Sequence, residues 1–403
     1  MDPKGGGPSQ GIRNSIPAQL ALGRVNEVVC LDAPTCEYGC IDCFPIHKVG
    51  KGSSPWHYHR SFAPWLSEHL SQYEAVIIHG LWQYASYAVT HQIAKMRHAG
   101  RAVPRVYVMP HGMLDPWFQR DNSRRMKAWR NWFYWKLLER RTILNADGLL
   151  FTCQKELELA RCAFHPYRPL QEFNVGYGVA QPPSFTETMR TAFIEACPQL
   201  GERSYLLFLS RIHPKKGVDL LIDAYSKIAN SGSSRSSLPA LVIAGPNDSE
   251  YAQSMQQLAT RHGLLGKDDG PAVCFTGMLQ GNAKWGAFYG CDAFVLPSHQ
   301  ENFGIAAVES LACGKPVLLS DQVNIASDIA TDGAAVVAED TDVGTQQMLN
   351  EWFTMTDDKR SSLANAAVNC YQKRYLPTAA AHTFVEAIQS SILRPNHLLP
   401  ICE

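Results

Sequence analysis

Two carboxylates stand eight positions apart in segment 298–316, where their spacing could serve ligand binding. A strand-like apolar run at 292–297 precedes Glu301, and a helix-like pattern opens between Glu301 and Glu309. At about 1.5 Å per residue, eight positions span roughly 12 Å along a helix axis. The backbone N–H groups between the carboxylates would favour an anion through the helix dipole. These groups belong to Asn302, Phe303, Gly304 and Ile305. The spacing suits a nucleotide-diphosphate sugar, with hydroxyls at both ends and a pyrophosphate between them. Two solvated glutamates on an ordinary α/β crossover are the alternative.

A basic pair follows the apolar run 205–209. Arg211 and Lys216 leave the end of this expected strand and lead into a helix. Arginine offers a bidentate fork to phosphate, and lysine offers a point charge. Together they could neutralise a leaving diphosphate without a metal ion. A solvated, basic helix start is the alternative.

Glycines follow two further apolar runs. Gly245 ends the run 240–244, and Gly277 comes shortly after 273–275. Loops in these positions could contact a nucleotide base, or they could be plain turns. A third glycine-rich stretch includes Gly5, Gly6 and Gly7, and its backbone amides could approach the donor closely. A flexible chain start is the alternative for that stretch.

Two His-Gly pairs occupy matching positions in the first half of the chain. His79 and His111 each come at the end of an apolar run. A histidine at the carboxyl end of a strand could hydrogen-bond a sugar hydroxyl or move a proton. The repetition favours a catalytic role for His111 over a structural one. His79 and the nearby Asp115 are assigned to the acceptor side.

The composition of the chain and its cysteines limit the classes of protein to which it can belong. The chain has 403 residues, 45% of them hydrophobic, and 37 basic residues balance 37 acidic ones, which gives no support to nucleic-acid binding. No apolar run reaches the length of a membrane span, and residues 1–7 hold no apolar signal core. The 12 cysteines are scattered, many of them inside apolar runs, and favour buried thiols in a reducing cytoplasm. Cys36, Cys40 and Cys43, with His47 nearby, could hold an iron–sulfur cluster or zinc, but unliganded thiols are the default expectation.

Strand-like runs alternate with helical patterns along the whole chain, which predicts parallel sheets wrapped by helices. The expected strands are 27–31, 75–78, 106–109, 148–151, 205–209, 240–244, 273–275, 293–296, 317–319 and 335–338. Prolines 182, 183 and 198 place a linker between two doubly wound, Rossmann-like domains. The predicted division is a first domain at 1–180, a linker at 181–204, a second domain at 205–375, and a helix and tail at 376–403 that could pack back on the first domain. Two such domains would bind ligand at the carboxyl ends of their strands, in a cleft between them.

Segment 117–141 is rich in aromatic and basic residues. Trp129, Trp132, Phe133 and Lys136 follow helical spacing, and Asp121 and Glu139 are the acids of the segment. A helix lying on anionic lipid has this composition, and so does a packed helix with a basic outer face. Both interpretations stay open. The predicted location is cytoplasmic, with peripheral contact at the inner face of the plasma membrane under the first interpretation.

These motifs together resemble the GT-B-fold retaining glycosyltransferases of family 4, and most closely the bacterial exopolysaccharide and surface-glycan type. In the second half the ordered matches are Leu-Ser-Arg211-Ile-His-Pro-Lys-Lys216-Gly, Ile-Ala-Gly245-Pro, Phe-Thr-Gly277, and Pro297 to Val317 with both glutamates. The first half matches more loosely, through Gly6-Gly7-Pro-Ser, His79-Gly-Leu-Trp, Pro-His111-Gly-Met and Phe151-Thr-Cys-Gln-Lys-Glu156.

The resemblance implies a role for each motif. Glu309 would hold the ribose hydroxyls, Glu301 the donor sugar, and Arg211 with Lys216 the diphosphate. His111 would lie beside the sugar on the acceptor side. The donor would be a UDP or GDP sugar, the acceptor a glycan or a lipid-linked molecule, and no metal or other cofactor would be required. The family is thought to work by front-side attack, with the departing phosphate accepting the acceptor's proton.

One departure from the family pattern concerns the first domain. Such proteins usually begin with an apolar strand before the glycine loop, and here Met1-Asp-Pro-Lys stands in its place. The expectation is therefore a first domain without its central strand. Two other functions stay open: a GT-B sugar-nucleotide epimerase, and an inactive transferase-like subunit of a glycan assembly.

Overall fold

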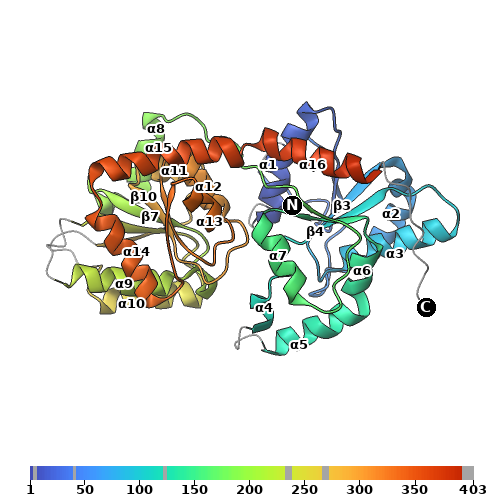
Figure 1. The fold of residues 1–403 in the computed structure, drawn as a ribbon, viewed down its shortest axis with the longest axis horizontal. Helices are drawn as coiled ribbons and strands as arrows, with labels where there is room; N and C mark the ends of the chain where they lie inside the picture. Colours follow the sequence, from blue (N-terminus) through green and yellow to red (C-terminus); the bar gives the residue numbers. More distant parts are fainter. Residues whose placement is uncertain (3–6, 40–41, 121–124, 232–237, 266–271, 393–403) are drawn as a thin grey trace. The chain divides into compact units, whose positions relative to one another are not determined.

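The computed structural model describes residues 1–2, 7–39, 42–120, 125–231, 238–265 and 272–392. The chain divides into two compact units (Figure 1). The first unit comprises Met1–Gly178 together with Pro377–Glu403, and the second comprises Val179–Leu376. Each unit is an α/β structure built on parallel strands, which confirms the predicted fold class.

The second unit is built on a doubly wound sheet of six strands, all parallel. Its strands are β7 (Tyr205–Leu209), β8 (Ala240–Ala244), β9 (Val273–Gly277), β10 (Ala293–Leu296), β11 (Val317–Ser320) and β12 (Ala335–Ala338). The spatial order is β12-β11-β10-β7-β8-β9, so the direction of winding reverses between β7 and β10. Ligands bind at such a reversal, because the loops on either side of it lead apart.

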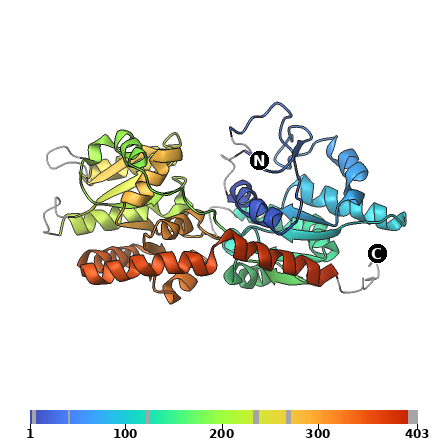
Figure 2. The same cartoon turned by 90° about the horizontal axis from the view of Figure 1, so that it is seen from above.

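Helices cover this sheet on both faces (Figures 1 and 2). One layer holds α9 (Val218–Ala229), α10 (Glu250–Arg261) and α14 (Asp342–Thr354). The other holds α8 (Glu187–Ala196), α11 (Gly281–Gly290), α12 (Ile305–Ala312) and α15 (Asp357–Arg374). A short helix α13 (Ala326–Thr331) joins β11 to β12. Burial from both sides explains why most of the strands read as continuous apolar runs.

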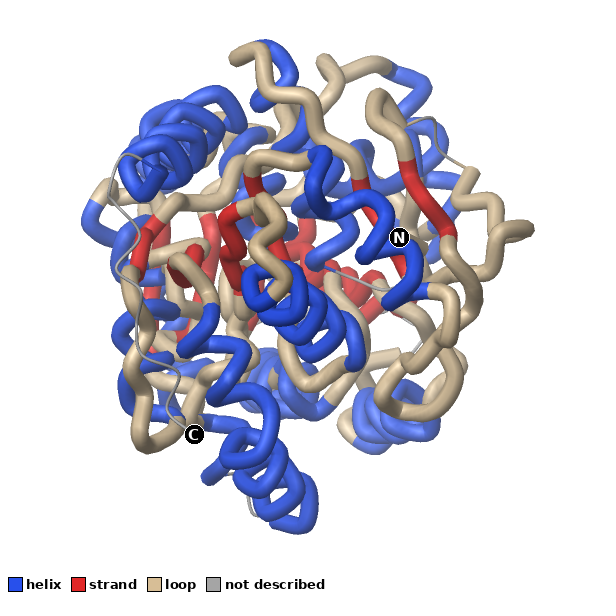
Figure 3. Tube along the Cα trace, turned by 90° about the vertical axis from the view of Figure 1, so that its right-hand side faces the viewer, coloured by secondary structure: helices blue, strands red, loops and turns tan. Residues whose placement is uncertain are grey.

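The first unit contains a sheet of four parallel strands in the order β3-β4-β5-β6 and a separate parallel pair, β1-β2. The strands are β1 (Val28–Cys30), β2 (Ile46–Lys48), β3 (Ala75–His79), β4 (Arg105–Met109), β5 (Gly148–Phe151) and β6 (Glu172–Asn174). The helices are α1 (Gly7–Ala21), α2 (Phe62–His69), α3 (Tyr84–His98), α4 (Trp117–Arg120), α5 (Arg125–Tyr134), α6 (Arg140–Asn145), α7 (Gln154–Ala163) and α16 (Pro377–Ile392), and a π-helical turn spans Trp135–Glu139. Figure 3, in which this unit faces the viewer, shows helices covering its strands.

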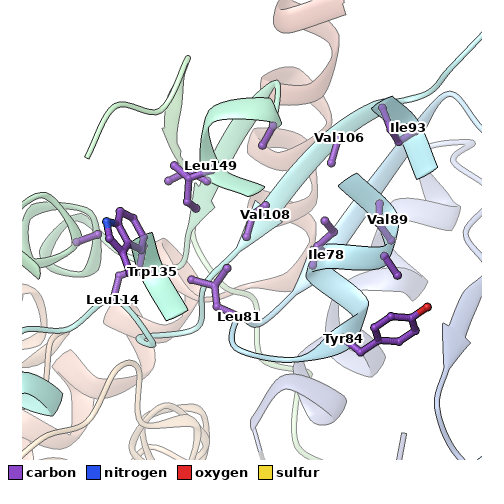
Figure 4. Close-up of a cluster of buried hydrophobic side chains, with 14 of the residues drawn as sticks. Ile78, Leu81, Tyr84, Val89, Ile93, Val106, Val108, Leu114, Trp135 and Leu149 are labelled. Atoms are coloured by element: carbon purple, nitrogen blue, oxygen red, sulfur yellow. The ribbon is translucent and has the colours of Figure 1, made fainter. Parts of the chain in front are cut away.

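The core of the first unit follows the alternation of its strands. Val106 and Val108 of β4 are fully buried in a cluster that also takes in Leu149 of β5 and Trp135 of the π-helical turn (Figure 4). Tyr107 lies between the two valines and is buried outside this cluster, and its hydroxyl donates to the carbonyl oxygen of Ile388 in α16 at 3.3 Å. This contact, with the packing of α1 against α16, places the C-terminal helix in the first unit.

Two sequence predictions are corrected by these elements. The predicted linker 181–204 contains α8, which packs against α11 and belongs to the second unit. Its Met189 and Phe193 are buried, but nearby prolines had obscured this helix in the sequence. The prediction of a glycine loop at residues 5–7 is wrong at Gly7, because this residue is the first of α1. Gly5 and Gly6 lie outside the described residues. No helix in the described ranges combines the length and the apolar character needed to cross a membrane.

Candidate active site

The loops that follow β7 and β10 meet at the reversal of strand order. The backbone N–H of His299 donates to the carbonyl oxygen of Lys215 at 3.0 Å and ties the two loops together. Gly217 has a left-handed φ of 65°, and a Cβ built there would lie 2.0 Å from the carbonyl oxygen of Pro297. This close approach excludes any side chain at position 217. Local backbone packing therefore fixes the position of Lys216, one residue earlier.

Lys216 and Glu301 form an ion pair between these loops. The Lys216 side chain is 9% exposed and the Glu301 side chain 19%. Burial alone would raise the pKa of Glu301, but the Lys216 ammonium, with smaller contributions from Lys215 and Arg211, lowers it overall. Arg211 lies on the same loop with an exposed side chain. The structure thus brings Lys216 and Glu301 into contact and leaves the Arg211 guanidinium open to a ligand.

The segment after Glu301 is held by the neighbouring turn at 322–324. The Glu301 N–H donates to the Gln322 carbonyl at 3.1 Å, and the Asn324 N–H donates to the Glu301 carbonyl at 3.0 Å. Gly304 then adopts a left-handed φ of 80° and caps α12, which begins at Ile305, between the two glutamates. The Asn302 side chain accepts from Asn324 at 3.3 Å, and the Phe303 ring is buried against Tyr375. These side chains are structural, so a role in donor binding for 302–305 falls to the backbone.

Glu309 lies about one helical turn after the start of α12, is buried, and pairs with a lysine that the sequence analysis did not identify. The Lys284 Nζ atom, on α11, donates to Glu309 Oε1 at 2.6 Å. Glu309 is 7% exposed, and Lys284 also lies over the Trp285 ring at 4.5 Å. Lys284 sits in no recognisable motif, and only the packing of α11 against α12 brings it to the carboxylate.

Gly245 and Gly277 meet at the ends of β8 and β9. The Gly245 N–H donates to the Gly277 carbonyl at 2.9 Å, and a Cβ at position 245 would lie 2.1 Å from the Ser210 carbonyl oxygen. Asn247 bridges the two glycines, with its amide donating to the Gly245 carbonyl at 3.0 Å and accepting from the Gly277 N–H at 3.1 Å. Gly245 is therefore required by backbone packing, whereas Gly277 is favoured by its left-handed φ of 74°. Asn247 is a second polar residue whose role the sequence did not indicate.

In the first unit the structure brings the two predicted histidines together. His79 Nδ1 and His111 Nε2 are 2.9 Å apart, and their rings are stacked. One nitrogen must donate and the other accept, so the pair cannot hold a full complement of protons. Desolvation of the two rings lowers the pKa of both imidazoles, and the neighbouring His79 lowers the pKa of His111 further. His79 is exposed, so water can still reach its ring. The short contact between the two ring nitrogens disfavours a proton on both, so we expect the pair to be largely neutral at pH 7.

Buried carboxylates hold the loops that carry these histidines. Glu156 of α7 accepts the Gly112 N–H at 2.5 Å and the Thr152 hydroxyl at 2.6 Å, directly beside His111. Glu139 of the π-helical turn accepts the Trp82 N–H at 2.7 Å, three residues after His79. Trp82 has an unusual left-handed φ of 69°, so Glu139 stabilises a strained turn.

Glu139 also accepts a hydrogen bond from the Ser86 hydroxyl at 2.8 Å. Burial raises the pKa of Glu139 to about 7, despite these hydrogen bonds. Asp115, predicted on the acceptor side, is 7% exposed and accepts the Trp117 N–H at 2.8 Å at the start of α4. In this structure its carboxylate therefore supports the turn after His111.

Gly7, predicted to bind the donor, is the exposed first residue of α1. Its carbonyl oxygen accepts from the Tyr177 hydroxyl at 3.1 Å. A Cβ at Gly11 would lie 1.3 Å from that hydroxyl, so tight packing accounts for the glycine at position 11.

The predicted cysteine cluster gives no metal site among the residues placed here. Cys36 and Cys43 are exposed free thiols, and Cys40 lies outside the described residues. In the described ranges, no group of three His, Cys, Asp or Glu side chains is arranged to hold a metal ion.

The charged side chains of the second unit gather at the carboxyl ends of parallel strands, the place where α/β proteins of this class bind ligands. The fold is that of the GT-B glycosyltransferases. A sucrose-phosphate synthase from Thermosynechococcus elongatus superposes with a TM-score of 0.69 at 16% identity, over 96% of this chain and 94% of that one. A UDP-forming trehalose-phosphate synthase from Burkholderia xenovorans gives 0.63 at 13% identity, over 83% and 78% of the two chains.

Sequence comparison finds glycosyltransferase domains in both halves of the chain. Residues 6–171 match the family described as "Glycosyl transferase 4-like domain", and residues 190–369 match "Glycosyl transferases group 1". The D-inositol 3-phosphate glycosyltransferase of Gordonia bronchialis is 31% identical over 46% of this chain and 41% of its own length. That of Thermomonospora curvata is 36% identical over 28% of this chain and 26% of its own length. The matched segments thus span well under half of these relatives.

Proposed function

We propose that this protein is a retaining glycosyltransferase that moves a hexose from a nucleotide-diphosphate sugar to a glycan or lipid-linked acceptor. The observation that carries the proposal is the Lys216–Glu301 pair at the reversal of strand order, with Arg211 on the same loop. A buried cation at that position suits a diphosphate that gains charge as the glycosidic bond breaks. The biosynthesis of a bacterial exopolysaccharide or other surface glycan is the proposed setting.

The roles proposed for the donor side follow the geometry of the second unit. Lys216 and Arg211 bind and stabilise the departing diphosphate, so we expect no metal requirement. Glu301, held next to Lys216, accepts hydrogen bonds from the hydroxyls of the donor sugar. Glu309 accepts them from the ribose, with Lys284 fixing its carboxylate. Gly245 and Gly277 contact the base, and the backbone of 302–305 donates to the phosphates.

The acceptor side of the proposal lies in the first unit. His111, paired with His79, hydrogen-bonds the reacting sugar or the attacking hydroxyl. Because the imidazole pair is expected to be largely neutral, it can donate and accept without adding positive charge. The proton of the attacking hydroxyl passes to the departing phosphate, and the new bond forms on the face that the phosphate leaves, so the configuration is retained. The named relatives add phosphorylated sugars and polyols to the acceptors that deserve testing.

The first experiment is a thermal shift of the wild-type protein and Glu309→Ala with UDP, GDP and ADP. A nucleotide that binds the folded state raises the melting temperature by mass action. We expect one nucleotide to do so, and Glu309→Ala to weaken its binding by about 1–3 kcal/mol through lost charge-assisted hydrogen bonds. Glu351→Ala, an exposed position on α14, is the matched control. Unchanged affinity in Glu309→Ala would rule out the ribose assignment.

A second measurement separates the proposed activity from its alternatives. The protein is incubated with a nucleotide-diphosphate sugar that carries the preferred nucleotide. Separate reactions contain no acceptor, a glycan, a lipid-linked acceptor or a sugar phosphate. Transfer with retained configuration supports the proposal. Conversion of the donor sugar without an acceptor would indicate an epimerase, and nucleotide binding without turnover would indicate an inactive subunit of an assembly.

A further inference from the structure

Large apolar side chains gather on one exposed face of α5 and the π-helical turn that follows it. Trp129 is 69% exposed, Trp132 41%, Phe133 50% and Leu137 65%. Their spacing places them along one side of the helix, and the rings contact one another: Trp129 and Phe133 have centroids 5.9 Å apart, and Trp132 and Phe133 5.1 Å. We call these four side chains the aromatic face.

The opposite side of the same segment is anchored in the core of the first unit. Trp135 is 1% exposed and stacks on Phe164, and Figure 4 shows it near Leu114. Glu139 is also 1% exposed and binds the Trp82 N–H. The helix is therefore fixed in rotation, and the aromatic face points away from the core that could have covered it.

Positive charge surrounds the aromatic face. Arg130, Lys136 and Arg141 are exposed, and Lys136 Nζ lies 3.9 Å from the centroid of the Trp132 ring. The sole acid in 129–141 is Glu139, which is buried. A second copy docked on this face would bring like charges together. Anionic lipid offers the opposite charge, and tryptophan prefers the boundary between headgroups and acyl chains.

We propose that the aromatic face and its basic rim form a docking surface for a membrane leaflet that contains anionic lipid. The aromatic rings and Leu137 enter the interface, while Arg130, Lys136 and Arg141 meet lipid phosphates. The helix α4, which follows the turn after His111, contacts α5, so a docked protein could receive a lipid-linked acceptor near that turn. This last step rests on the proposed function, whereas the docking itself does not.

The test is co-sedimentation of the full chain with vesicles of phosphatidylcholine alone or with about a third phosphatidylglycerol, without nucleotide or acceptor. We expect binding to the anionic vesicles and its loss at 1 M salt, where charges are screened. Trp129→Ala/Phe133→Ala should weaken the partition by about tenfold or more through lost apolar contact. Lys136→Glu should weaken it by about fivefold or more, since each basic side chain near such a surface contributes on that scale.

Matched variants control for general effects of these changes. Phe185→Ala and Lys95→Glu alter an aromatic and a basic side chain that are also exposed, and both should bind as the wild type does. All variants should keep the wild-type melting temperature because the altered side chains are exposed. Absence of wild-type binding to anionic vesicles, or full binding by the double variant, would overturn the proposal. A dimer in light scattering that the double variant abolishes would also overturn it, by assigning the face to a second copy. If the protein transfers sugar but does not bind the vesicles, the docking proposal is wrong and the proposed glycosyltransferase function stands.

Discussion

The contact between Lys216 and Glu301 shows how one pair of side chains can serve both structure and chemistry. Each charge is largely withdrawn from water, and each is compensated by the other. A bound donor would add negative charge beside Lys216 and hydroxyls beside Glu301. Under the proposed function the pair is arranged in advance for a ligand that needs both, which would lower the cost of organising the site.

A lysine pair on the β7 loop tests this role. Lys216→Met should slow sugar transfer by about 10²–10³-fold, the loss typical of removing one donor to a developing charge. The neighbouring Lys215→Met removes a charge that acts on Glu301 only from further away, and it should cost less than about tenfold. Steady-state kinetics with the preferred donor measure both. Equal effects in the two variants would contradict a specific role for Lys216.

Glu139 predicts how stability depends on pH. Its pKa rises from 4.5 to about 7 in the folded protein, so the folded state binds its proton more tightly than the unfolded chain. The stabilisation is fully present below pH 4.5 and is lost as pH rises towards 7, after which it is constant. The loss corresponds to about 3 kcal/mol for a shift of this size.

Urea denaturation between pH 4.5 and 8 measures this dependence. Glu139→Gln keeps an oxygen that can accept from Trp82 and Ser86 but cannot titrate, so its stability should fall less with pH than that of the wild type. Glu158→Gln, at an exposed position on α7, should follow the wild-type curve. Parallel curves for all three proteins would show that Glu139 is not held in its protonated form.

At the scale of elements, the sequence located strands better than it located partners. Strands β5, β7, β8, β10 and β12 match the predicted ranges because they are short apolar runs bounded by polar turns. The strands β2 and β6 were not predicted, since Ile46–Lys48 and Glu172–Asn174 contain too few apolar residues. Lys284 was not predicted as a site residue for a different reason. Its contact with Glu309 arises from the packing of two helices, which no local motif encodes. The sequence analysis placed Lys216 and Glu301 after two strands but did not predict their contact, because that contact depends on β7 and β10 being neighbours in the sheet.

Substitutions at two glycines in the second unit can distinguish destabilisation by backbone strain from destabilisation by steric collision. Gly217 and Gly333 both have positive φ, at 65° and 75°, but a Cβ at Gly333 would meet nothing closer than 3.9 Å. Gly333→Ala should therefore cost about 1–2 kcal/mol, the strain of a left-handed residue. Gly217→Ala adds a collision with the Pro297 carbonyl and should cost at least about 3 kcal/mol. Denaturant unfolding measures both, and similar losses would show that the two loops can move apart.

At the scale of the whole molecule, the chain forms its first unit from segments at both ends. The helix α16 follows the entire second unit in the sequence, yet it packs against α1 and accepts a hydrogen bond from Tyr107 of β4. Its Ala381 and Ala387 are buried. The residues proposed to bind the donor, in contrast, lie between Val179 and Leu376, in a unit whose sheet is complete without either end of the chain. Function and folding should therefore respond differently to removal of α16.

Ending the chain at residue 376 tests this division. The truncated protein should lose the calorimetric transition of the first unit, or show it lowered by at least about 5 °C, because β4 and α1 lose the helix that covers them. The transition of the second unit should stay within about 2 °C and should still rise with the preferred nucleotide, since Lys216, Glu301 and Glu309 are untouched. Tyr107→Phe in the full chain removes the single hydrogen bond to α16 and should produce a much smaller change. A truncated protein in which both units melt as before would mean that α16 adds nothing to the first unit, and a loss of the nucleotide response would mean that donor binding depends on more than the second unit.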